Sequence, residues 1–170
     1  LDPASPEGRK VVERMVKRAD VVIANLPQAT LNSMGLDYAT LCSYKPDVIF
    51  VTNTAFGAVG PMHRNVGFDS VAQAMCGSVY MTGEPEQPYR ATAPWVDFGT
   101  ALHCAFGTMA ALMERQKTGK GQMVTGALLA TALTVNNAAL IEQALIKPDR
   151  IPTRNRGQTA APSDIYKARD

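Results

Sequence analysis

Two short apolar runs, separated by helical patterns, limit the folds open to this chain. The runs cover residues 21–24 (VVIA) and 48–52 (VIFVT), and neither shows the alternation typical of a strand with one face in water. Apolar spacing predicts an amphipathic helix at 7–19 and short helices at 30–34 and 38–44. Buried strands that alternate with helices are typical of an α/β fold with a mostly parallel sheet and flanking helices.

The second half of the chain predicts longer helices. A helix is expected at 70–76, and a long one follows Asp97 and ends before the turn at 119–121. A short strand is expected at 122–125, followed by a single helix at 127–145. The apolar stretches 102–113 and 127–144 contain polar side chains, so we expect buried core helices. A membrane span needs roughly 20 predominantly apolar residues without such interruptions.

Composition narrows the classes of function. Apolar residues make up 46% of the 170 residues, charged residues make up 19%, and the net charge is +2. These values exclude a disordered chain, and the small basic excess gives no reason to expect nucleic-acid binding. The three cysteines stand far apart at 42, 76 and 104, so we expect reduced thiols, no disulfide framework and a cytoplasmic protein.

The sequence lacks the usual motifs for metals and bound cofactors. His63 and His103 lie far apart, no cysteine pair has metal-ligand spacing, and neither a glycine-rich phosphate loop nor a GxSxG motif occurs. We therefore expect no metal and no permanently bound cofactor. His103 and Cys104 stand inside an apolar helical pattern and are expected to be packed core residues.

Asp97 is the strongest candidate for chemistry. It follows Trp95 and Val96 and precedes the long helical pattern, so one interpretation is a helix N-cap that accepts a backbone hydrogen bond. The other interpretation is a carboxylate nucleophile, which a helix N-terminus would keep ionised and which Gly99 would leave open to a ligand. Composition and spacing do not choose between the two.

Six segments in a fixed order carry a resemblance to a known family. They are ADVVIAN at 19–25, GFD at 67–69, AQA at 72–74, TGEP at 82–85, Asp97 with the helix end AALMER at 110–115, and KTGKGQ at 117–122. Each segment alone is weak. Together they resemble the class III CoA-transferases (CaiB/BaiF-like proteins), the family of formyl-CoA transferase and the carnitine CoA-transferases, over nearly the whole chain.

The resemblance implies a fold and a reaction. The fold is the Rossmann-like large domain of an interlocked homodimer, and the partners are acyl-CoA and carboxylic acid substrates, with no nucleic acid and no membrane. Asp97 would attack the thioester carbonyl of an acyl-CoA to form a mixed anhydride. The CoA thiolate would convert this anhydride into an aspartyl-CoA thioester, and an acceptor carboxylate would take over the CoA through a second anhydride. Coenzyme A is then a substrate and not a bound cofactor.

Contacts to CoA are also implied by the resemblance. They fall on a first loop, on the turn after the first strand, and on a segment near the thioester: Leu1, Asp2, Asn25, Leu26, Pro27, Val66, Gly67, Phe68 and Asp69. Ala24 and Ser33 depart from the Glu and Arg that many members carry, and Arg is the usual fork for phosphate. Asp69 has two interpretations, a second acidic group of the site or the N-cap of the helix at 70–76.

Alternatives to CoA transfer stay open. The α-methylacyl-CoA racemases of the same family need a second acid/base group, a histidine, at the position of Phe68. Because Phe cannot move a proton, this residue favours transfer. Another alternative is a non-catalytic CoA-binding module, which would account for Ala24 and Ser33. The last is a folding fragment without activity of its own.

The length of the chain matters for its domain organisation. Family members are longer, and the first residue is Leu and not Met. We therefore expect an internal piece, with residues 1–146 as the central part of the large domain and 147–170 as a linker toward a small domain that is absent. The proline- and arginine-containing composition after Lys147 predicts this boundary. On this interpretation the chain alone is inactive, and other segments or a dimer partner cover part of its apolar surface.

Overall fold

Three parallel strands form the centre of the chain, as the sequence predicts. A computed structural model describes residues 1–147 and 149–169. The strands are β1 (Val21–Ala24), β2 (Ile49–Thr54) and β3 (Met123–Ala127), in the order β1-β2-β3. Both pairs are parallel, with Val22 opposite Phe50 and Val51 opposite Val124. The predicted α/β architecture with a parallel sheet is therefore confirmed.

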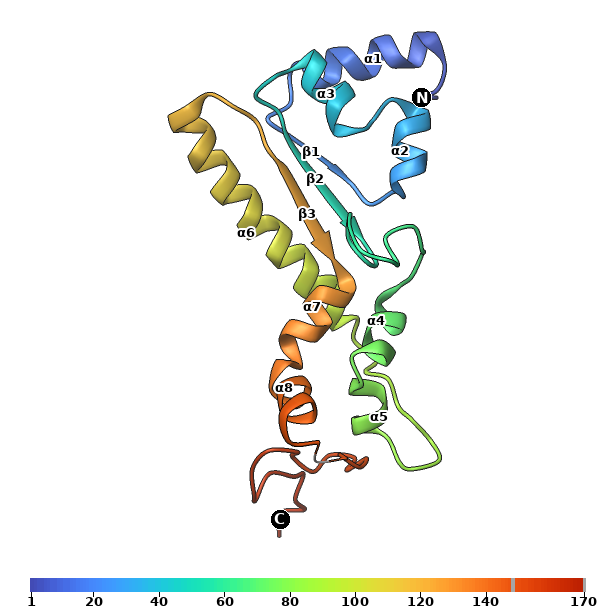
Figure 1. Cartoon of the computed structure of the whole chain (residues 1–170), viewed down its shortest axis with the longest axis vertical. Coiled ribbons are helices and arrows are strands. Elements are labelled where there is room, and N and C mark those ends of the chain that lie inside the picture. The colour runs from blue at the N-terminus through green and yellow to red at the C-terminus, as the bar shows by residue number, and fades with distance from the viewer. Residues whose placement is uncertain (148, 170) are drawn as a thin grey trace.

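Eight helices accompany the strands in the described part of the chain. They are α1 (Pro6–Val16), α2 (Gln28–Met34), α3 (Tyr38–Tyr44), α4 (Asp69–Met75), α5 (Ser78–Thr82), α6 (Trp95–Thr118), α7 (Leu128–Val135) and α8 (Asn137–Ile146). The sheet with α1–α3 and most of α6 lies at one end of an elongated molecule. The helices α4, α5 and α8 and the last residues lie at the other end (Figure 1).

The two faces of the sheet are covered by different helices, because successive side chains of a strand point to opposite faces. Phe50 packs with Val16, Leu31 and Leu41 from α1, α2 and α3. Its neighbours in β2, Ile49 and Val51, pack with Cys104 and Ala111 of α6. Figure 1 shows α1–α3 on one side of the strands and α6 on the other. Burial on both faces explains why the sequence of β2 does not alternate. The prediction of a buried strand at 21–24 is wrong, because β1 lies at the edge of the three-stranded sheet and Ile23 is 74% exposed.

Three helix predictions need correction. The helix predicted at 7–19 ends at Val16, because Arg18 and Ala19 turn to tighter hydrogen bonds with the carbonyls of Met15 and Val16. The helix α5 was not predicted at all. The single helix predicted at 127–145 is two helices bent by 72°. The bend falls at Asn136, whose side-chain amide donates to Cys76 Sγ at 3.0 Å.

The long helix α6 is covered on one side only. Val96, Thr100, Cys104 and Ala111 are buried, and the helix packs along β2 and β3. The opposite side carries large apolar residues that are between 63% and 77% exposed, namely Phe98, Leu102, Phe106, Met109 and Met113. The prediction of a buried helix at 102–113 is therefore wrong. The prediction of a buried helix at 127–144 is wrong in its second part, because α8 has no buried residue. His103 is likewise exposed and not packed in the core, although its Nδ1 lies 3.1 Å from Thr131 Oγ1.

Among the described residues, α6 is long and apolar enough to cross a membrane by length and composition. The bent pair α7 and α8 passes the same test when it is counted as one span. Core helices meet these criteria as well, and one side of α6 lies on the strands. The structure therefore gives only weak support for a span.

The residues after α8 form no helix or strand in their described part, 149–169. They return along the chain: the Thr153 N–H donates to the carbonyl of Met81 in α5, and Arg154 pairs with Glu84 at 3.1 Å. Arg150 pairs with Glu142 of α8. The segment predicted as a linker thus packs on α5 and α8, while the domain boundary at 146/147 stays a prediction.

Candidate active site

A cavity of about 720 Å³ opens at the carboxyl ends of all three strands. Asn25 follows β1, Thr54 is the last residue of β2, and Leu128 follows β3, and all three residues line the cavity. Because the strands are parallel, their carboxyl ends meet at one edge of the sheet, where α/β folds usually bind ligands. The volume lies in the range of small-molecule sites.

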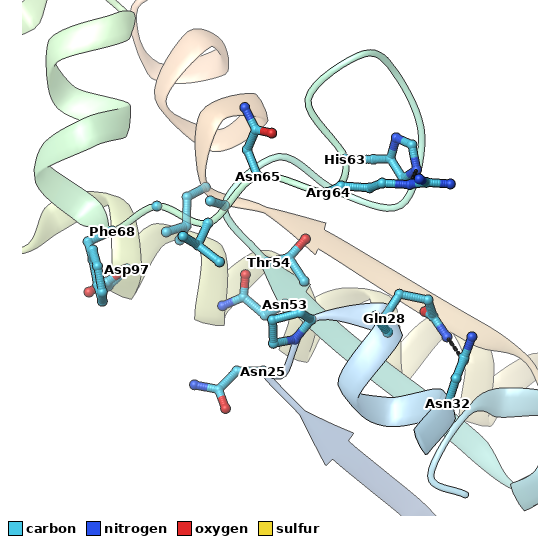
Figure 2. A pocket seen from close by; sticks show the side chains of 16 residues that line it. Asn25, Gln28, Asn32, Asn53, Thr54, His63, Arg64, Asn65, Phe68 and Asp97 are labelled. Carbon is cyan, nitrogen blue, oxygen red and sulfur yellow. Dashed lines mark hydrogen bonds between the residues drawn. The ribbon is translucent and has the colours of Figure 1, made fainter. Parts of the chain in front are cut away.

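The cavity has two ends that differ in their residues (Figure 2). At one end Phe68 and Asp97 lie close to the starts of α4 and α6, and we call this the Asp97 end. At the other end Gln28 and Asn32 of α2 face a loop that carries His63 and Arg64, and we call this the polar end. A ligand that fills the cavity therefore meets a carboxylate at one end and amides and a cation at the other.

Asp97 is the third residue of α6 and not its N-cap. The helix begins at Trp95, and the preceding Pro94 offers no side-chain cap. The N-cap interpretation is therefore wrong. No hydrogen bond to the Asp97 carboxylate is found within the described residues, and this group lines the cavity. Partial burial, and next the negative charge of Asp69, raise the pKa of Asp97 above its ordinary value.

Asp69 does not cap its own helix either. Phe68 occupies the N-cap position of α4, and the buried Asp69 carboxylate turns toward α6. Its Oδ2 accepts hydrogen bonds from the N–H groups of Val96, at 2.9 Å, and Asp97, at 3.1 Å. Asp69 does not line the cavity. The structure thus gives it a third role that neither sequence interpretation included: it caps a second helix.

Gly99 also differs from the expectation that it opens the site to a ligand. It faces α7, where a Cβ at this position would lie 3.1 Å from Thr131 Cγ2. Gly67, and not Gly99, lines the cavity. A Cβ at Gly67 would lie 3.0 Å from the Cβ of Ala55, so a side chain at this position would force the chain beyond the end of β2 to shift by a few tenths of an ångström.

The remaining predicted contacts divide into two groups. Those that line the cavity are Asn25, Pro27, Val66, Gly67 and Phe68. Leu26 turns into the core formed with α1–α3. Leu1 and Asp2 lie outside the cavity, and Asp2 Oδ1 instead accepts a hydrogen bond from the Ala4 N–H before α1. Their contact to a ligand stays a prediction.

Several lining residues were not predicted. They are mostly polar and come from α2, the end of β2, the loop after it and the start of α7: Gln28, Ala29, Asn32, Asn53, Thr54, Ala55, His63, Arg64, Asn65 and Leu128. Their position could have been read from the sequence in part, because Asn53 and Thr54 directly follow the strand predicted at 48–52. Nothing in the sequence pattern marks His63 and Arg64.

Three or more His, Cys, Asp or Glu side chains that could hold a metal do not come together anywhere in residues 1–147 and 149–169. The thiol of Cys104 is buried against β2 and β3, and this burial raises its pKa. Cys104 is therefore a packing residue, as expected from the sequence.

Comparison with known proteins decides the family. The family described as CoA-transferase family III matches residues 1–170. The chain belongs to CoA-transferase family III. Succinyl-CoA--D-citramalate CoA-transferase of Chloroflexus aurantiacus is 32% identical over 100% of this chain and 42% of its own length. Succinate--glutarate CoA-transferase of Agrobacterium fabrum is 37% identical over 84% of this chain and 35% of its own length.

A solved family structure has the same fold. The CaiB/BaiF family protein from Brucella suis superposes with a TM-score of 0.83, at 34% identity, over 96% of this chain and 44% of that chain. This chain thus spans about two fifths of the length of the family III proteins that it matches. The curated relatives are named as CoA-transferases, so they use CoA thioesters as substrates.

Family membership sharpens the question raised by Ala24 and Ser33. Ala24 packs in the core with α1–α3, and the Ser33 hydroxyl donates to the carbonyl of Thr30. Neither residue lines the cavity. Arg64 is the one Arg or Lys among the lining residues. In this family III chain the positive charge at the cavity therefore comes from the loop after β2 and not from the end of α2.

Proposed function

We propose that the complete protein moves CoA from an acyl-CoA thioester to a carboxylic acid, with Asp97 as the nucleophile. The observation that carries the proposal is the position of this carboxylate. It lines the cavity at the first turn of α6, and no hydrogen bond to it is found in the part of the chain that the structure describes. A carboxylate that is not engaged elsewhere is free to attack a bound thioester.

The reaction proceeds in two symmetric halves. An oxygen of Asp97 attacks the thioester carbonyl carbon of the donor, the carbon–sulfur bond breaks, and a mixed anhydride and the CoA thiolate result. The thiolate then attacks the aspartyl carbonyl carbon, which releases the donor acid and leaves an aspartyl-CoA thioester. The second half reverses these steps. The acceptor carboxylate attacks the aspartyl-CoA thioester, which releases the CoA thiolate and forms a second mixed anhydride. The thiolate then attacks the acyl carbon of the acceptor, which gives the new acyl-CoA and frees the Asp97 carboxylate.

The electrostatics of the site suit this role. Attack requires an ionised carboxylate, and the helix N-terminus favours the ionised form. Burial and the charge of Asp69 act in the opposite direction and raise the pKa of Asp97. The group is therefore more basic than an ordinary surface aspartate, and a more basic carboxylate is the better nucleophile as long as it is ionised.

Binding of CoA is proposed for the rest of the cavity. Asn25 and Pro27 form the turn after β1, and the exposed Arg64 offers a planar fork for a phosphate group at the polar end. His63 lies beside it, with its Nε2 at 3.3 Å from Arg64 Nε. The thioester would then reach Asp97 past Gly67 and Phe68.

Racemisation of an acyl-CoA is the less favoured activity. It needs two groups that exchange a proton with the α-carbon. Phe68 lines the Asp97 end and cannot exchange a proton, while His63 lies toward the polar end (Figure 2). We expect no exchange of the α-proton of an acyl-CoA in deuterium oxide, measured by mass spectrometry. Clear exchange would favour the racemase interpretation.

A homodimer is proposed for the complete protein. The exposed apolar side of α6, from Phe98 to Met113, and the exposed Leu145 and Ile146 of α8 need a cover. Light scattering coupled to size-exclusion chromatography measures the mass directly. We expect twice the mass of one chain, and a monomer would contradict the proposal.

The test of the reaction is chemical trapping. The complete protein is incubated with an acyl-CoA and quenched with hydroxylamine, which converts an activated aspartate into a hydroxamate. We expect the hydroxamate on the peptide that contains Asp97, identified by mass spectrometry, and none after incubation with free CoA. If the protein transfers CoA but carries no label at Asp97, the nucleophile is wrong. A folded protein without label or transfer would support the non-catalytic alternative.

A further inference from the structure

The first turn of α6 is capped by a side chain from another helix. The first N–H groups of a helix have no partner inside it, and an N-cap side chain usually accepts from one of them. Pro94 cannot do so. Asp69 of α4 instead accepts from the N–H groups of Val96 and Asp97 with a single carboxylate oxygen, Oδ2. The residue that carries the proposed nucleophile is thus bonded directly to Asp69 through its backbone.

Asp69 is itself held in place. Gln73 lies one turn further along α4, is completely buried, and donates from Nε2 to the other oxygen of Asp69, Oδ1. The Gln73 Oε1 accepts from the N–H of Ala91 at 2.9 Å, which ties down the segment that leads into α6. The two side chains therefore connect α4, the approach to α6 and the first turn of α6 in one closed network.

The neighbourhood leaves little room for another arrangement. Val96 is completely buried against Ala72 of α4 and against Leu128 and Ala132 after β3. If the Asp69 carboxylate were lost, the N–H of Val96 would stay buried without a partner, which is costly in a protein interior. The turn would then have to shift or fray, and the direction of the Asp97 side chain would change with it.

We propose that Asp69 is a positioning residue of this site, which fixes the first turn of α6 and so aims the Asp97 carboxylate into the cavity, with Gln73 as its support. The inference rests on the proposed function of Asp97. Asp69 does not line the cavity, so it acts through Asp97 and not on the substrate. Correct orientation of a reacting group is worth large factors in rate, and a misplacement of about 1 Å can cost roughly 100-fold.

The test compares two variants of the complete protein. Asp69→Ala removes both acceptor oxygens, whereas Asp69→Asn keeps one oxygen that can accept from the two N–H groups. We expect kcat to fall about 10- to 100-fold in Asp69→Ala, with the KM for the acyl-CoA changed by less than about threefold. We expect Asp69→Asn to recover only part of this loss, because its amide nitrogen would face the Gln73 Nε2 that donates to Oδ1 in the wild type. Val16→Ala in α1 serves as a control, because it weakens the far face of the sheet without touching α6.

Amide hydrogen exchange gives a readout that does not depend on activity. The peptide containing Val96 and Asp97 should exchange faster in Asp69→Ala than in the wild type, the increase should be smaller in Asp69→Asn, and Val16→Ala should leave the exchange unchanged. Wild-type kcat or wild-type exchange in Asp69→Ala would overturn the inference. Equal loss of kcat in both Asp69 variants, with wild-type exchange in Asp69→Asn, would do the same, because it would point to charge and not to position.

Two further variants keep the outcomes separate. If Asp69→Ala does not fold, Gln73→Ala replaces it, and we expect a smaller fall in kcat with the same change in exchange. Unchanged kcat and exchange in Gln73→Ala would then overturn the inference. Asp97→Asn tests the proposed function alone: if it keeps its transfer activity, Asp97 is not the nucleophile, whatever the exchange data show for Asp69.

Discussion

The two ends of the cavity are built in different ways. At the Asp97 end, α6 is held by buried hydrogen bonds and by close packing: Asp69 and Gln73 fix its first turn, and the hydroxyls of Thr100 and Thr131 lie 2.9 Å apart one turn later. At the polar end the side chains are exposed and bond mainly to near neighbours in sequence, as in the 2.8 Å bond from Gln28 to Asn32.

This difference fits the two tasks of the cavity under the proposed function. A reacting carboxylate must keep one orientation, and the buried hydrogen bonds of Asp69 and Gln73 hold the helix turn that carries it. A long, flexible ligand tail can be bound by side chains that adjust to it, and exposed amides and an arginine do so at little cost. The comparison predicts large effects of substitutions at the Asp97 end and modest effects at the polar end.

The largest effect is expected for Asp97→Asn. The amide cannot attack the thioester, so we expect kcat for CoA transfer to fall by about 10⁴-fold or more, with the fold intact. Steady-state kinetics of the complete protein measure this change. The control is Asp164→Asn, since Asp164 is exposed in the C-terminal segment. A fall in kcat of less than about tenfold would contradict the role of Asp97 as the nucleophile.

The next effect is a loss of stability at the interface where α6 packs on β3. A Cβ added at Gly126 would lie 2.4 Å from Cys104 Sγ and 3.1 Å from Thr100 Cγ2. We expect Gly126→Ala to lower the free energy of unfolding by about 1–3 kcal/mol, because a packed interface cannot absorb another methyl group. Thermal or urea unfolding measures the change.

Gly99→Ala is the matched comparison for Gly126. Its new methyl group would also contact a neighbouring helix, here α7, at 3.1 Å from Thr131 Cγ2. Gly99 lies inside a helix, however, where Ala is favoured over Gly by about 1 kcal/mol, so we expect the two effects to cancel. If Gly99→Ala destabilised as strongly as Gly126→Ala, the contact of α6 with β3 would not be the tighter of the two.

A smaller effect is expected at the polar end. Arg64→Ala removes the cation of the cavity, and an exposed charge-assisted contact is worth about 1 kcal/mol, so the KM for the acyl-CoA should rise about fivefold. The value of kcat should hardly change, and added salt should reduce the difference from wild type. The exposed Arg18 of the region after α1 gives the control, Arg18→Ala. A fall in kcat without a change in KM would assign Arg64 to the reaction instead.

The smallest effect is a pH dependence of stability. Because burial and Asp69 raise the pKa of Asp97 in the folded protein, folding favours the protonated form. The stability from this group is present at low pH and is lost as the pH rises through the folded-state pKa. Asp97→Asn lacks this loss, so near pH 7 it should be slightly more stable than wild type, and the effect is small because solvent screens the exposed Asp97 carboxylate. Chemical unfolding at several pH values measures the difference, which should vanish in acid.

Local pattern was enough to predict elements whose bounds are set by residues inside the segment or directly beside it. The strand at 21–24 and the helix at 38–44 have the predicted bounds, and Asp37 caps the latter through the Thr40 N–H. The end of α2 at Gly35 also follows from a local rule, since this residue has φ +67°. At these positions the residues beside the element are enough to predict where it begins or ends.

The features that the sequence did not predict depend on contacts between distant residues. The break at Asn136 involves Cys76, the C-cap residue of α4, and the role of Asp69 involves the start of α6. Apolar periodicity also cannot tell whether a helix is covered on one side or on both, so it missed the exposed side of α6. The polar end was missed because His63 and Arg64 reach the cavity through the path of a loop.

The order of the strands in the sheet has a consequence for how the chain folds. β2 and β3 are neighbours, with Thr52 opposite Thr125, although α4, α5 and α6 lie between them in sequence. Closing such a large loop costs entropy before any contact compensates for it, which makes the step slow. Asp97 lies inside this loop, and Leu128, which follows β3, lines the same cavity. We therefore expect the cavity to be complete only once β3 has paired with β2.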